Sequence, residues 1–308
     1  MDIQEELAKF APDRPTLLTI GVFDGVHLGH RYLLDRLIAR AEEKGCLAGV
    51  VTFKTHPEKV LRRRDVLPWI CSLQERVRLL KAAGVDVVVP LTFTRSVADL
   101  TAREFVVLLK KHLKMCDLVL GPDFAMGRGR QGDPAYLRKV GKELDFDVEV
   151  MKPARLGNEV ISSSAIRRLL AEGNVSRAGE MLGRPFTMEG RVVMGDRRGR
   201  LLGFPTANMK VHRDHAVPGD GIYATIVHRE GRQLQSVTNI GRRPTFAGLK
   251  RLIETYIMDF NGDLYGRKLR IQVVSRLRDE MRFDSVEDLK RQMARDVAQA
   301  RKVLGKTG

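Results

Sequence analysis

Two histidines near the start of the chain are spaced as phosphate-binding side chains could be. The stretch GVFDGVHLGH covers residues 21–30, with His27 and His30 placed where an apolar run has ended and a helical pattern begins. Residues three apart share one face of a helix, and the first turn of a helix attracts anions through its free N–H groups. Both imidazoles could therefore donate to phosphate oxygens and stabilise the charge that develops in phosphoryl or nucleotidyl transfer.

Two other interpretations of the histidine pair are open. Asp24, His27 and His30 could be three ligands of one metal ion, or the histidines could simply pack and cap the helix. For a histidine pair on its own, packing is the commoner role. The choice therefore depends on which other residues accompany the pair.

A serine-rich segment further along could complete a phosphate site. Residues 161–167 read ISSSAIR, in which Ser162, Ser163 and Ser164 offer hydroxyl groups at the start of a predicted helix. Arg167 in the first turn could clamp a phosphate through two N–H groups. Capping alone would also explain the serines, and a surface salt bridge would also explain Arg167.

A second glycine-rich segment could hold a nucleotide and a metal ion. Residues 195–209 read GDRRGRLLGFPTANM, so that Gly195, Gly199 and Gly203 precede Thr206 and Asn208. Glycine lets a backbone close over phosphates, and hydroxyl and amide oxygens are hard donors that suit Mg²⁺ together with nucleotide oxygens. The glycines alone are a weak signal, because the turns of β domains are rich in glycine.

The first half of the chain alternates strand-like and helix-like segments, and this pattern would position the histidines. Short runs rich in β-branched residues are separated by segments with apolar residues at helical spacing. The predicted strands cover 16–21, 47–53, 85–91, 116–121 and 146–152, and the predicted helices cover 30–45, 72–84, 101–113 and 133–144. This alternation predicts a parallel α/β layer fold, whose ligands bind beyond the carboxyl ends of the strands.

The second half of the chain has a different pattern of apolar residues, with many strand-like runs and few helical ones. Two short helices are predicted at 161–173 and 175–183, and the sequence GRPF at 183–186 then marks a boundary. Strand-like runs between Gly, Asp and Asn turns follow at 187–195, 221–228, 233–241, 251–260 and 268–278, before one amphipathic helix at 285–304. This pattern indicates a β-barrel or a sandwich. We therefore predict two domains, an α/β domain of residues 1–183 and a β domain of residues 184–308.

Composition limits the class of protein. Hydrophobic residues make up 43% of the 308 residues and charged residues 30%, and no apolar run approaches the ~18 residues of a membrane helix. The first ten residues carry acidic charges and no signal-peptide core, so we expect a cytoplasmic protein that is not bound to a membrane. Cys46, Cys71 and Cys116 lie far apart in the sequence, so we expect reduced, mostly buried thiols and neither a disulfide framework nor a zinc site.

The excess of basic residues does not by itself predict nucleic-acid binding. Lys and Arg total 54 against 38 Asp and Glu, which gives a net charge of +16. Such a balance attracts polyanions, but the charge is scattered, and aromatic residues make up only 6% of the chain. We expect a solvated basic surface that suits phosphate ligands, with no nucleic-acid partner.

Four segments of the first half resemble, in order, the motifs of one enzyme family. GVFDGVHLGH resembles the HxGH signature of the adenylyl- and cytidylyltransferase superfamily, in the form GxFDGxHxGH typical of bacterial flavin-adenylating enzymes. FKTHP at 53–57 resembles their FxxHP segment, GPDFAMG at 121–127 their GxDFxFG loop, and ISSSAIR their ISSTxxR motif. Four ordered motifs are much more specific than one HxGH.

This resemblance implies a Rossmann-like nucleotidyltransferase domain and a role for each residue of the motifs. His27, His30 and Arg167 would be catalytic in adenylyl transfer. Ser164 replaces a threonine of the family and keeps the hydroxyl, whereas Met126 replaces an aromatic residue. The remaining motif residues would bind the nucleotide (Gly21, Phe23, Gly25, Gly29, Ser162, Ser163 and Ser164) or the flavin (His56, Pro57, Asp123 and Phe124).

The second half resembles a different enzyme. GFPTAN at 203–208 is similar to the GxPTAN signature of riboflavin kinases, and NIGRRPTF at 239–246 and DLYGRKLRI at 263–271 match later segments of that β-barrel domain. The resemblance implies that Thr206 and Asn208 bind Mg²⁺, and that the glycines at 195, 199 and 203 bind the nucleotide. It also implies that Glu254 is the general base, with Tyr256 in place of a histidine common in the family.

Together the motifs identify the chain, over roughly residues 15–303, as a member of the bacterial bifunctional riboflavin kinase and FAD synthetase family. The resemblance implies that ATP phosphorylates riboflavin to FMN, and that a second ATP adenylylates FMN to FAD with release of pyrophosphate. We expect Mg²⁺ as cofactor and a monomer or weak oligomer. Three alternatives stay open: another transferase of the superfamily, which has no reason to carry GFPTAN, a metal hydrolase using Asp24, His27 and His30, and a basic nucleic-acid-binding module.

Overall fold

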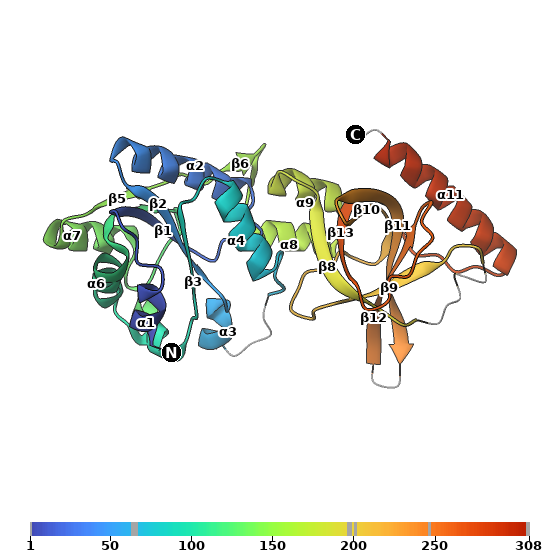
Figure 1. Ribbon diagram of the computed structural model, residues 1–308, viewed down its shortest axis with the longest axis horizontal. Helices are drawn as coiled ribbons and strands as arrows, with labels where there is room; N and C mark the ends of the chain where they lie inside the picture. Colours follow the sequence, from blue (N-terminus) through green and yellow to red (C-terminus); the bar gives the residue numbers. More distant parts are fainter. Residues whose placement is uncertain (1, 63–66, 196–198, 200–201, 246–247, 306–308) are drawn as a thin grey trace. The chain divides into compact units, whose positions relative to one another are not determined.

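The computed structural model describes residues 2–62, 67–195, 199, 202–245 and 248–305. The chain forms two compact units (Figure 1). The α/β unit contains residues 1–67 and 72–162, and the barrel unit contains residues 68–71 and 163–308. Each unit carries one of the two glycine-rich segments: residues 21–30 lie in the α/β unit and residues 195–209 in the barrel unit.

The α/β unit is built on a five-stranded parallel sheet, which confirms the predicted fold class of the first half. The strands are β1 (Thr16–Ile20), β2 (Leu47–Phe53), β3 (Val87–Leu91), β4 (Met115–Leu120) and β5 (Asp147–Val150), in the order β3-β2-β1-β4-β5. The central strand β1 is buried along its whole length, which explains its nearly continuous apolar sequence. Because all five strands are parallel, their carboxyl ends lie along one edge of the sheet.

Helices cover both faces of this sheet. Leu34 and Leu37 of α2 pack with Leu80 of α4 in one buried cluster, whereas α1, α6 and α7 pack in another around Leu109 and Leu137. The α-helices of the unit are α1 (Ile3–Ala8), α2 (Leu28–Glu43), α3 (Pro57–Arg62), α4 (Leu73–Ala82), α5 (Arg95–Asp99), α6 (Ala102–Leu113) and α7 (Pro134–Leu144). A 3₁₀ turn η1 (Arg128–Arg130) precedes α7, and a short hairpin of β6 (Arg155–Leu156) and β7 (Glu159–Val160) ends the unit.

The barrel unit contains a closed six-stranded barrel, so the sandwich alternative is wrong. Its strands are β8 (Phe186–Val193), β9 (Thr206–Val211), β10 (Gly221–Arg229), β11 (Arg232–Thr245), β12 (Gly248–Ile257) and β13 (Lys268–Arg278), in the order β10-β11-β12-β9-β8-β13. The predicted carboxy-terminal helix is α11 (Val286–Leu304). Strand β9 was not predicted, because its residues belong to the glycine-rich segment.

The two faces of the barrel wall have different chemistry. Four fully buried hydroxyl side chains hydrogen-bond to one another on one face: Thr225, Ser236, Thr238 and Thr255. On the opposite face, Ala224 and Val237 pack against α11 residues such as Ala300. Since side chains alternate along a strand, residues two or four positions from Val237 on β11, and the residues paired with them, project to the same face as Val237, toward α11.

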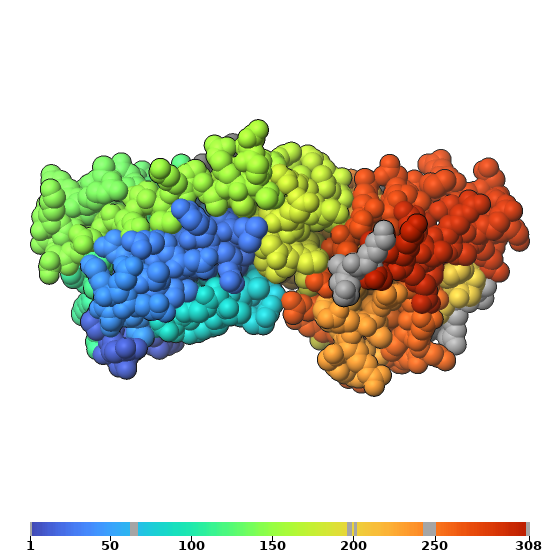
Figure 2. Space-filling view, turned by 90° about the horizontal axis from the view of Figure 1, so that it is seen from above, coloured from blue at the N-terminus to red at the C-terminus, as the bar shows by residue number. Residues whose placement is uncertain are grey.

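Helices α8 (Ser163–Ala171) and α9 (Val175–Leu182) belong to the barrel unit. Helix α9 lies against β8 and β13, and the Gly219 N–H donates to the Leu170 carbonyl of α8 at 2.8 Å. Figure 2 shows the yellow-green surface of this part of the chain next to the orange surface of later barrel residues. The structure therefore divides between Ser162 and Ser163, earlier than the expected boundary after residue 183. Where the independently folding domain begins stays a prediction.

Candidate functional site

The predicted histidine pair lies at the amino end of α2, directly after the central strand β1. His27 is the N-cap of the helix, and its Nδ1 accepts a hydrogen bond from the His30 backbone N–H at 3.2 Å. The two rings stack with centroids 3.6 Å apart. Because Nδ1 is an acceptor, the proton of a neutral His27 ring is on Nε2. Capping and anion binding are thus compatible roles.

The loop before α2 has the backbone that its glycines predict. Gly25 has φ 80°, and Phe23 and Val26 adopt φ of 51° and 38°, which non-glycine residues rarely do. A Cβ on Gly29 would lie 3.1 Å from the Ile161 carbonyl oxygen and 3.1 Å from His27 Nδ1. The backbone of the ISSSAIR segment therefore approaches the HxGH segment closely, and glycine at position 29 makes room for it.

A buried arginine that the sequence analysis did not single out fixes this loop. Arg76 of α4 is 1% exposed, and its Nη1 donates to the Val22 carbonyl at 3.0 Å and to the Phe53 carbonyl at 2.8 Å. Thr52 Oγ1 also donates to the Val22 carbonyl at 2.9 Å. Arg76 thus ties the end of β2 to the loop after β1. An arginine at helical spacing looks like a surface residue, so no local signal distinguishes it.

The predicted flavin-binding residues follow the carboxyl ends of neighbouring strands. His56 and Pro57 come after β2, and His56 Nδ1 accepts from the Glu58 backbone N–H at 3.3 Å. Asp123 and Phe124 come after β4, where Asp123 is exposed and Phe124 is half-buried against the apolar cluster. Met126, which replaces an aromatic residue, is buried in that same cluster, so its side chain serves packing.

The serines and Arg167 span the division between the units. Ser162 ends the α/β unit, and Ser163 and Ser164 begin α8 of the barrel unit. Arg167 donates from Nε to the Pro68 carbonyl at 2.8 Å. A role for Arg167 as a phosphate clamp stays a prediction.

The three-ligand metal site considered for Asp24, His27 and His30 does not form. Within the described ranges, no three His, Cys, Asp or Glu side chains are grouped so that they could hold a metal ion. Asp24 is 1% exposed and lies in the strained loop, whereas the histidine rings stack on each other.

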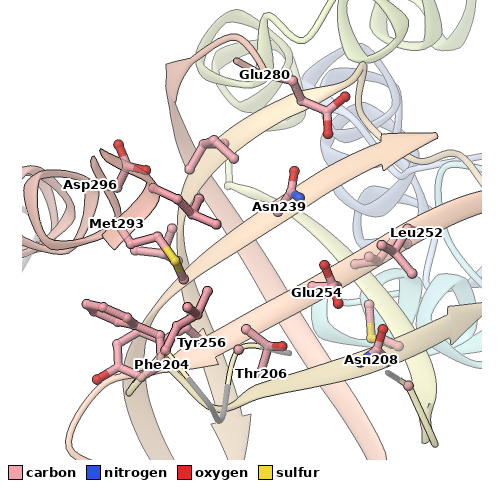
Figure 3. A pocket seen from close by; sticks show the side chains of 18 of the residues that line it. Phe204, Thr206, Asn208, Asn239, Leu252, Glu254, Tyr256, Glu280, Met293 and Asp296 are labelled. Carbon is pink, nitrogen blue, oxygen red and sulfur yellow. The ribbon is translucent and has the colours of Figure 1, made fainter. Parts of the chain in front are cut away.

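The second candidate site is a row of three side chains across the barrel wall. Glu254 of β12 is paired in register with Asn208 of β9 on one side and with Asn239 of β11 on the other. Directly paired residues project to the same face, with Cβ atoms about 5 Å apart. All three line a cavity of about 1280 Å³ on the face toward α11 (Figure 3). The predicted base therefore lies between two amide side chains.

Two glycines of the glycine-rich segment, Gly195 and Gly199, lie against one end of this row. A Cβ on Gly195 would lie 2.1 Å from Asn208 Nδ2, and one on Gly199 would lie 3.2 Å from Thr206 Oγ1. Gly203 has φ 83°, in the left-handed region that favours glycine. The loop residues 196–198 and 200–201 lie outside the described residues. Only glycine permits the backbone to approach Asn208 and Thr206 this closely.

The oxygens of this site fit a hard cation. Thr206 supplies a hydroxyl and Asn208 an amide, and Asn208 is 8% exposed. Asn239 Oδ1 is buried and accepts no hydrogen bond from the described part of the chain. A buried carbonyl oxygen without a donor is destabilising unless a ligand or ion satisfies it. Thr206 and Asn208 are hard oxygen donors that suit Mg²⁺ together with nucleotide oxygens, whereas Asn239 lies on the other side of Glu254 from Asn208.

Helix α11 forms the far wall of the cavity. Asp296, 3% exposed, accepts two hydrogen bonds from Arg278 at 2.9 and 2.7 Å, and another from Gln292 at 2.9 Å. The bidentate pair fixes α11 against β13. Burial raises the pKa of Glu280 at the cavity rim, with a smaller contribution from Asp220. Phe204 and Tyr256, which also line the cavity, contact edge to face at 5.3 Å.

Comparisons with known proteins agree with both halves of this description. A family model described as FAD synthetase matches residues 9–165, and one described as riboflavin kinase matches residues 182–304. The bifunctional riboflavin kinase/FMN adenylyltransferase of Escherichia coli K12 is 41% identical over 299 residues, which cover 96% of this chain and 95% of that protein. The chain belongs to this bifunctional family. It is therefore both a riboflavin kinase and an FMN adenylyltransferase, which takes riboflavin to FMN and then to FAD.

Other relatives support the same assignment. The bifunctional riboflavin kinase/FMN adenylyltransferase of Pseudomonas fluorescens is 38% identical over 304 residues, which cover 98% of this chain and 97% of that protein. A crystal structure described as a macrolide-efflux protein from Streptococcus pneumoniae matches with a TM-score of 0.88 and 31% identity, covering 96% of both chains. None of the helices in the described ranges is both long and apolar enough to cross a membrane.

Proposed function

We propose that the cavity of the barrel unit is the riboflavin kinase site, with Glu254 as general base. The single observation that carries the proposal is the register of Asn208, Glu254 and Asn239 across three strands of one cavity. Glu254 would accept the proton of the riboflavin 5′-hydroxyl as that oxygen attacks the γ-phosphorus of ATP, and ADP would leave.

Thr206 and Asn208 would hold Mg²⁺ in this site. When bound, the ion would neutralise charge on the ATP phosphates. The backbone around Gly195, Gly199 and Gly203 would pack against the nucleotide, since these glycines leave room beside Asn208 and Thr206. Tyr256 and Phe204 would form one wall of the pocket.

The amino end of α2 in the α/β unit would be the FMN adenylyltransferase site. A phosphate oxygen of FMN attacks the α-phosphorus of ATP and pyrophosphate leaves, so no protein nucleophile is needed. His27 Nε2 and the His30 ring would donate to the phosphates beside the free N–H groups of the helix. Arg167 would contribute a further contact to the phosphates. The other proposed nucleotide contacts come from the loop before α2, from α2 itself and from the ISSSAIR segment: Gly21, Phe23, Gly25, Gly29, Ser162, Ser163 and Ser164.

Flavin binding in this unit is proposed for the loops after β2 and β4. His56, Pro57, Asp123 and Phe124 follow strand ends on either side of β1, so they flank the nucleotide position. Because both reactions consume ATP, we also propose that the chain acts in the cytoplasm. We propose a monomer or weak oligomer.

A time course of flavin products tests these assignments. The full chain is incubated with riboflavin and ATP, with Mg²⁺ or with a chelator, and the flavins are separated by chromatography. We expect FMN to rise first and FAD to follow, with both products lost in the chelator. FAD formation without transient FMN, or undiminished turnover in the chelator, would contradict the proposed division of labour or the Mg²⁺ site.

A further inference from the structure

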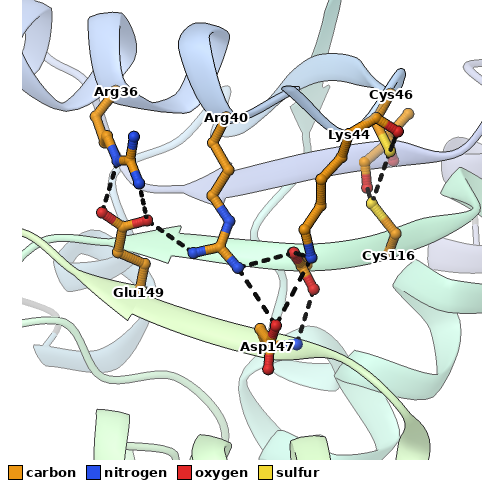
Figure 4. A network of polar contacts seen from close by, with 9 residues as sticks. Arg36, Arg40, Lys44, Cys46, Cys116, Asp147 and Glu149 are labelled. Atoms are coloured by element: carbon orange, nitrogen blue, oxygen red, sulfur yellow. Dashed lines mark hydrogen bonds and ion pairs between the residues drawn. The ribbon is translucent and has the colours of Figure 1, made fainter. Parts of the chain in front are cut away.

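The sequence keeps three cysteines apart, but the fold of the α/β unit brings two of them together. Cys46 precedes β2 and Cys116 lies at the start of β4, and the residues beside them, Leu47 and Met115, both pair with Thr16 of β1. Although the cysteines are 70 positions apart, their Sγ atoms are 3.2 Å from each other (Figure 4). Of the three cysteines only Cys71 is buried, so the expectation of mostly buried thiols is wrong for this pair.

We propose that Cys46 and Cys116 form a site of reversible oxidation, which closes to a disulfide when a hydroperoxide reaches it. The sulfur atoms need to approach from 3.2 Å to about 2.05 Å. Gly45, next to Cys46, has open space around it, so the loop after α2 can follow the sulfur. Neither thiol is fully buried, and Cys116 also lines a cavity of about 1200 Å³ where β1, β4 and β5 begin.

The surroundings distinguish the two thiols. Burial, and then the neighbouring Cys46 thiol, raises the pKa of Cys116 to about 12, and the Cys116 thiol donates to the Thr16 carbonyl at 3.2 Å. Cys116 is therefore protonated at neutral pH. Because Cys116 lies within β4 whereas Cys46 lies before the first residue of β2, we assign the first oxidation to Cys46. Lys44, two residues before Cys46, forms an ion pair with Asp117, which keeps the two segments together.

The chemistry balances in two steps. The Cys46 thiolate attacks one peroxide oxygen, the O–O bond breaks, and after protonation the products are Cys46 sulfenic acid and an alcohol, or water from hydrogen peroxide. The Cys116 sulfur then attacks the Cys46 sulfur, the S–O bond breaks, and the thiol proton leaves with the hydroxide as water. Two thiols are oxidised, one hydroperoxide is reduced, and a thiol reductant reverses the change.

The test starts from the full chain with its cysteines reduced. Trypsin places each cysteine on a separate peptide, so a disulfide can be assigned to a pair of cysteines: residues 45–54, 65–76 and 115–128. The protein is treated with hydrogen peroxide, the remaining thiols are alkylated, and the digest is analysed without reductant. We expect a linked pair of peptides 45–54 and 115–128 that a thiol reductant separates. Absence of this link, at a peroxide dose that oxidises Cys46, would overturn the proposal, as would a link to peptide 65–76.

Three variants give independent readouts. In Cys116→Ser, the sulfenic acid of Cys46 has no second thiol, so it should accumulate and be trapped by dimedone at least ~10-fold more than in the unaltered chain. Cys46→Ser should leave Cys116 free for alkylation. Cys71 is buried and belongs to the other unit, so Cys71→Ser is the matched control and should keep the link. Equal dimedone trapping with and without Cys116 would contradict the paired chemistry.

Discussion

The two sites of this chain are built from different structural elements. In the α/β unit, the proposed site is made of loops that follow the strands at one edge of a parallel sheet, together with the amino end of α2. In the barrel unit, the site is a row of side chains on paired strands, with Glu254 between Asn208 and Asn239. Loops need to be held in place from outside, as Arg76 holds the loop after β1, whereas strand pairing fixes a row of side chains directly.

This difference predicts that the two activities respond differently to single substitutions. Activity in the barrel should depend on single side chains of the row. Activity in the α/β unit should depend both on the histidines and on buried residues that never touch the substrate.

Glu254→Gln keeps the shape of the side chain but removes the proton acceptor. We expect kcat for FMN formation to fall roughly 10²- to 10⁴-fold, while FAD formation from added FMN is unchanged. The matched control is Glu230→Gln, because the Glu230 side chain is 77% exposed in the turn after β10. Near-normal turnover in Glu254→Gln would remove the base assignment.

Two shortened chains, 163–308 and 184–308, locate the start of the barrel domain. Both contain Thr206, Asn208 and Glu254, so both should make FMN and no FAD. Loss of α8 and α9 uncovers the sides of β8 and β13. We therefore expect 184–308 to be less stable to urea by about 3 kcal/mol, the scale of exposing one or two large apolar side chains. Equal stability would place the boundary after residue 183, as the sequence predicts.

His30→Ala removes one donor at the amino end of α2. We expect FAD formation from FMN to fall about 10²-fold, the usual loss for one preorganised donor, while FMN formation stays near its original rate. Tyr32→Ala on the same helix is the control, because Tyr32 is 48% exposed. If both activities fell together, the substitution would have damaged folding rather than the site.

Arg76→Met should weaken the loop without touching the substrate. It leaves the Val22 and Phe53 carbonyls without this donor, so we expect the α/β unit to lose about 2 kcal/mol of unfolding free energy. FAD formation should fall more than FMN formation. Arg78→Met on the same helix is the matched control, since the Arg78 side chain is 55% exposed and pairs with Glu75 at the surface. Equal effects of the two variants would exclude a role for Arg76 in holding the loop.

The sequence predicted most helices and strands of both units, because the spacing of apolar residues differs clearly between helical and strand segments. It also predicted that the histidines and glycines lie between a strand and a helix start, since this arrangement leaves a local pattern, and their roles stay predictions. Arg76 and Asn239 were missed for a physical reason. Their importance depends on which segments become neighbours in space, and nothing in the surrounding residues records that Arg76 reaches Val22 or that Asn239 pairs with Glu254.

The proximity of Cys46 and Cys116 was missed for the same reason. Strand order decides it, because β1 lies between β2 and β4 and brings their starts together. The position of α8 and α9 was likewise set by packing on the barrel rather than by the change of period at residues 183–186.

Mixing two variants tests most directly that the chain carries two separate sites. His30→Ala should convert riboflavin to FMN and stop there, and Glu254→Gln should make FAD only when FMN is supplied. We predict that an equimolar mixture of the two, given riboflavin, ATP and Mg²⁺, makes FAD, because FMN released by one variant reaches the other through solution. If each variant keeps its own half-reaction but the mixture makes no FAD, the account of two independent sites is contradicted.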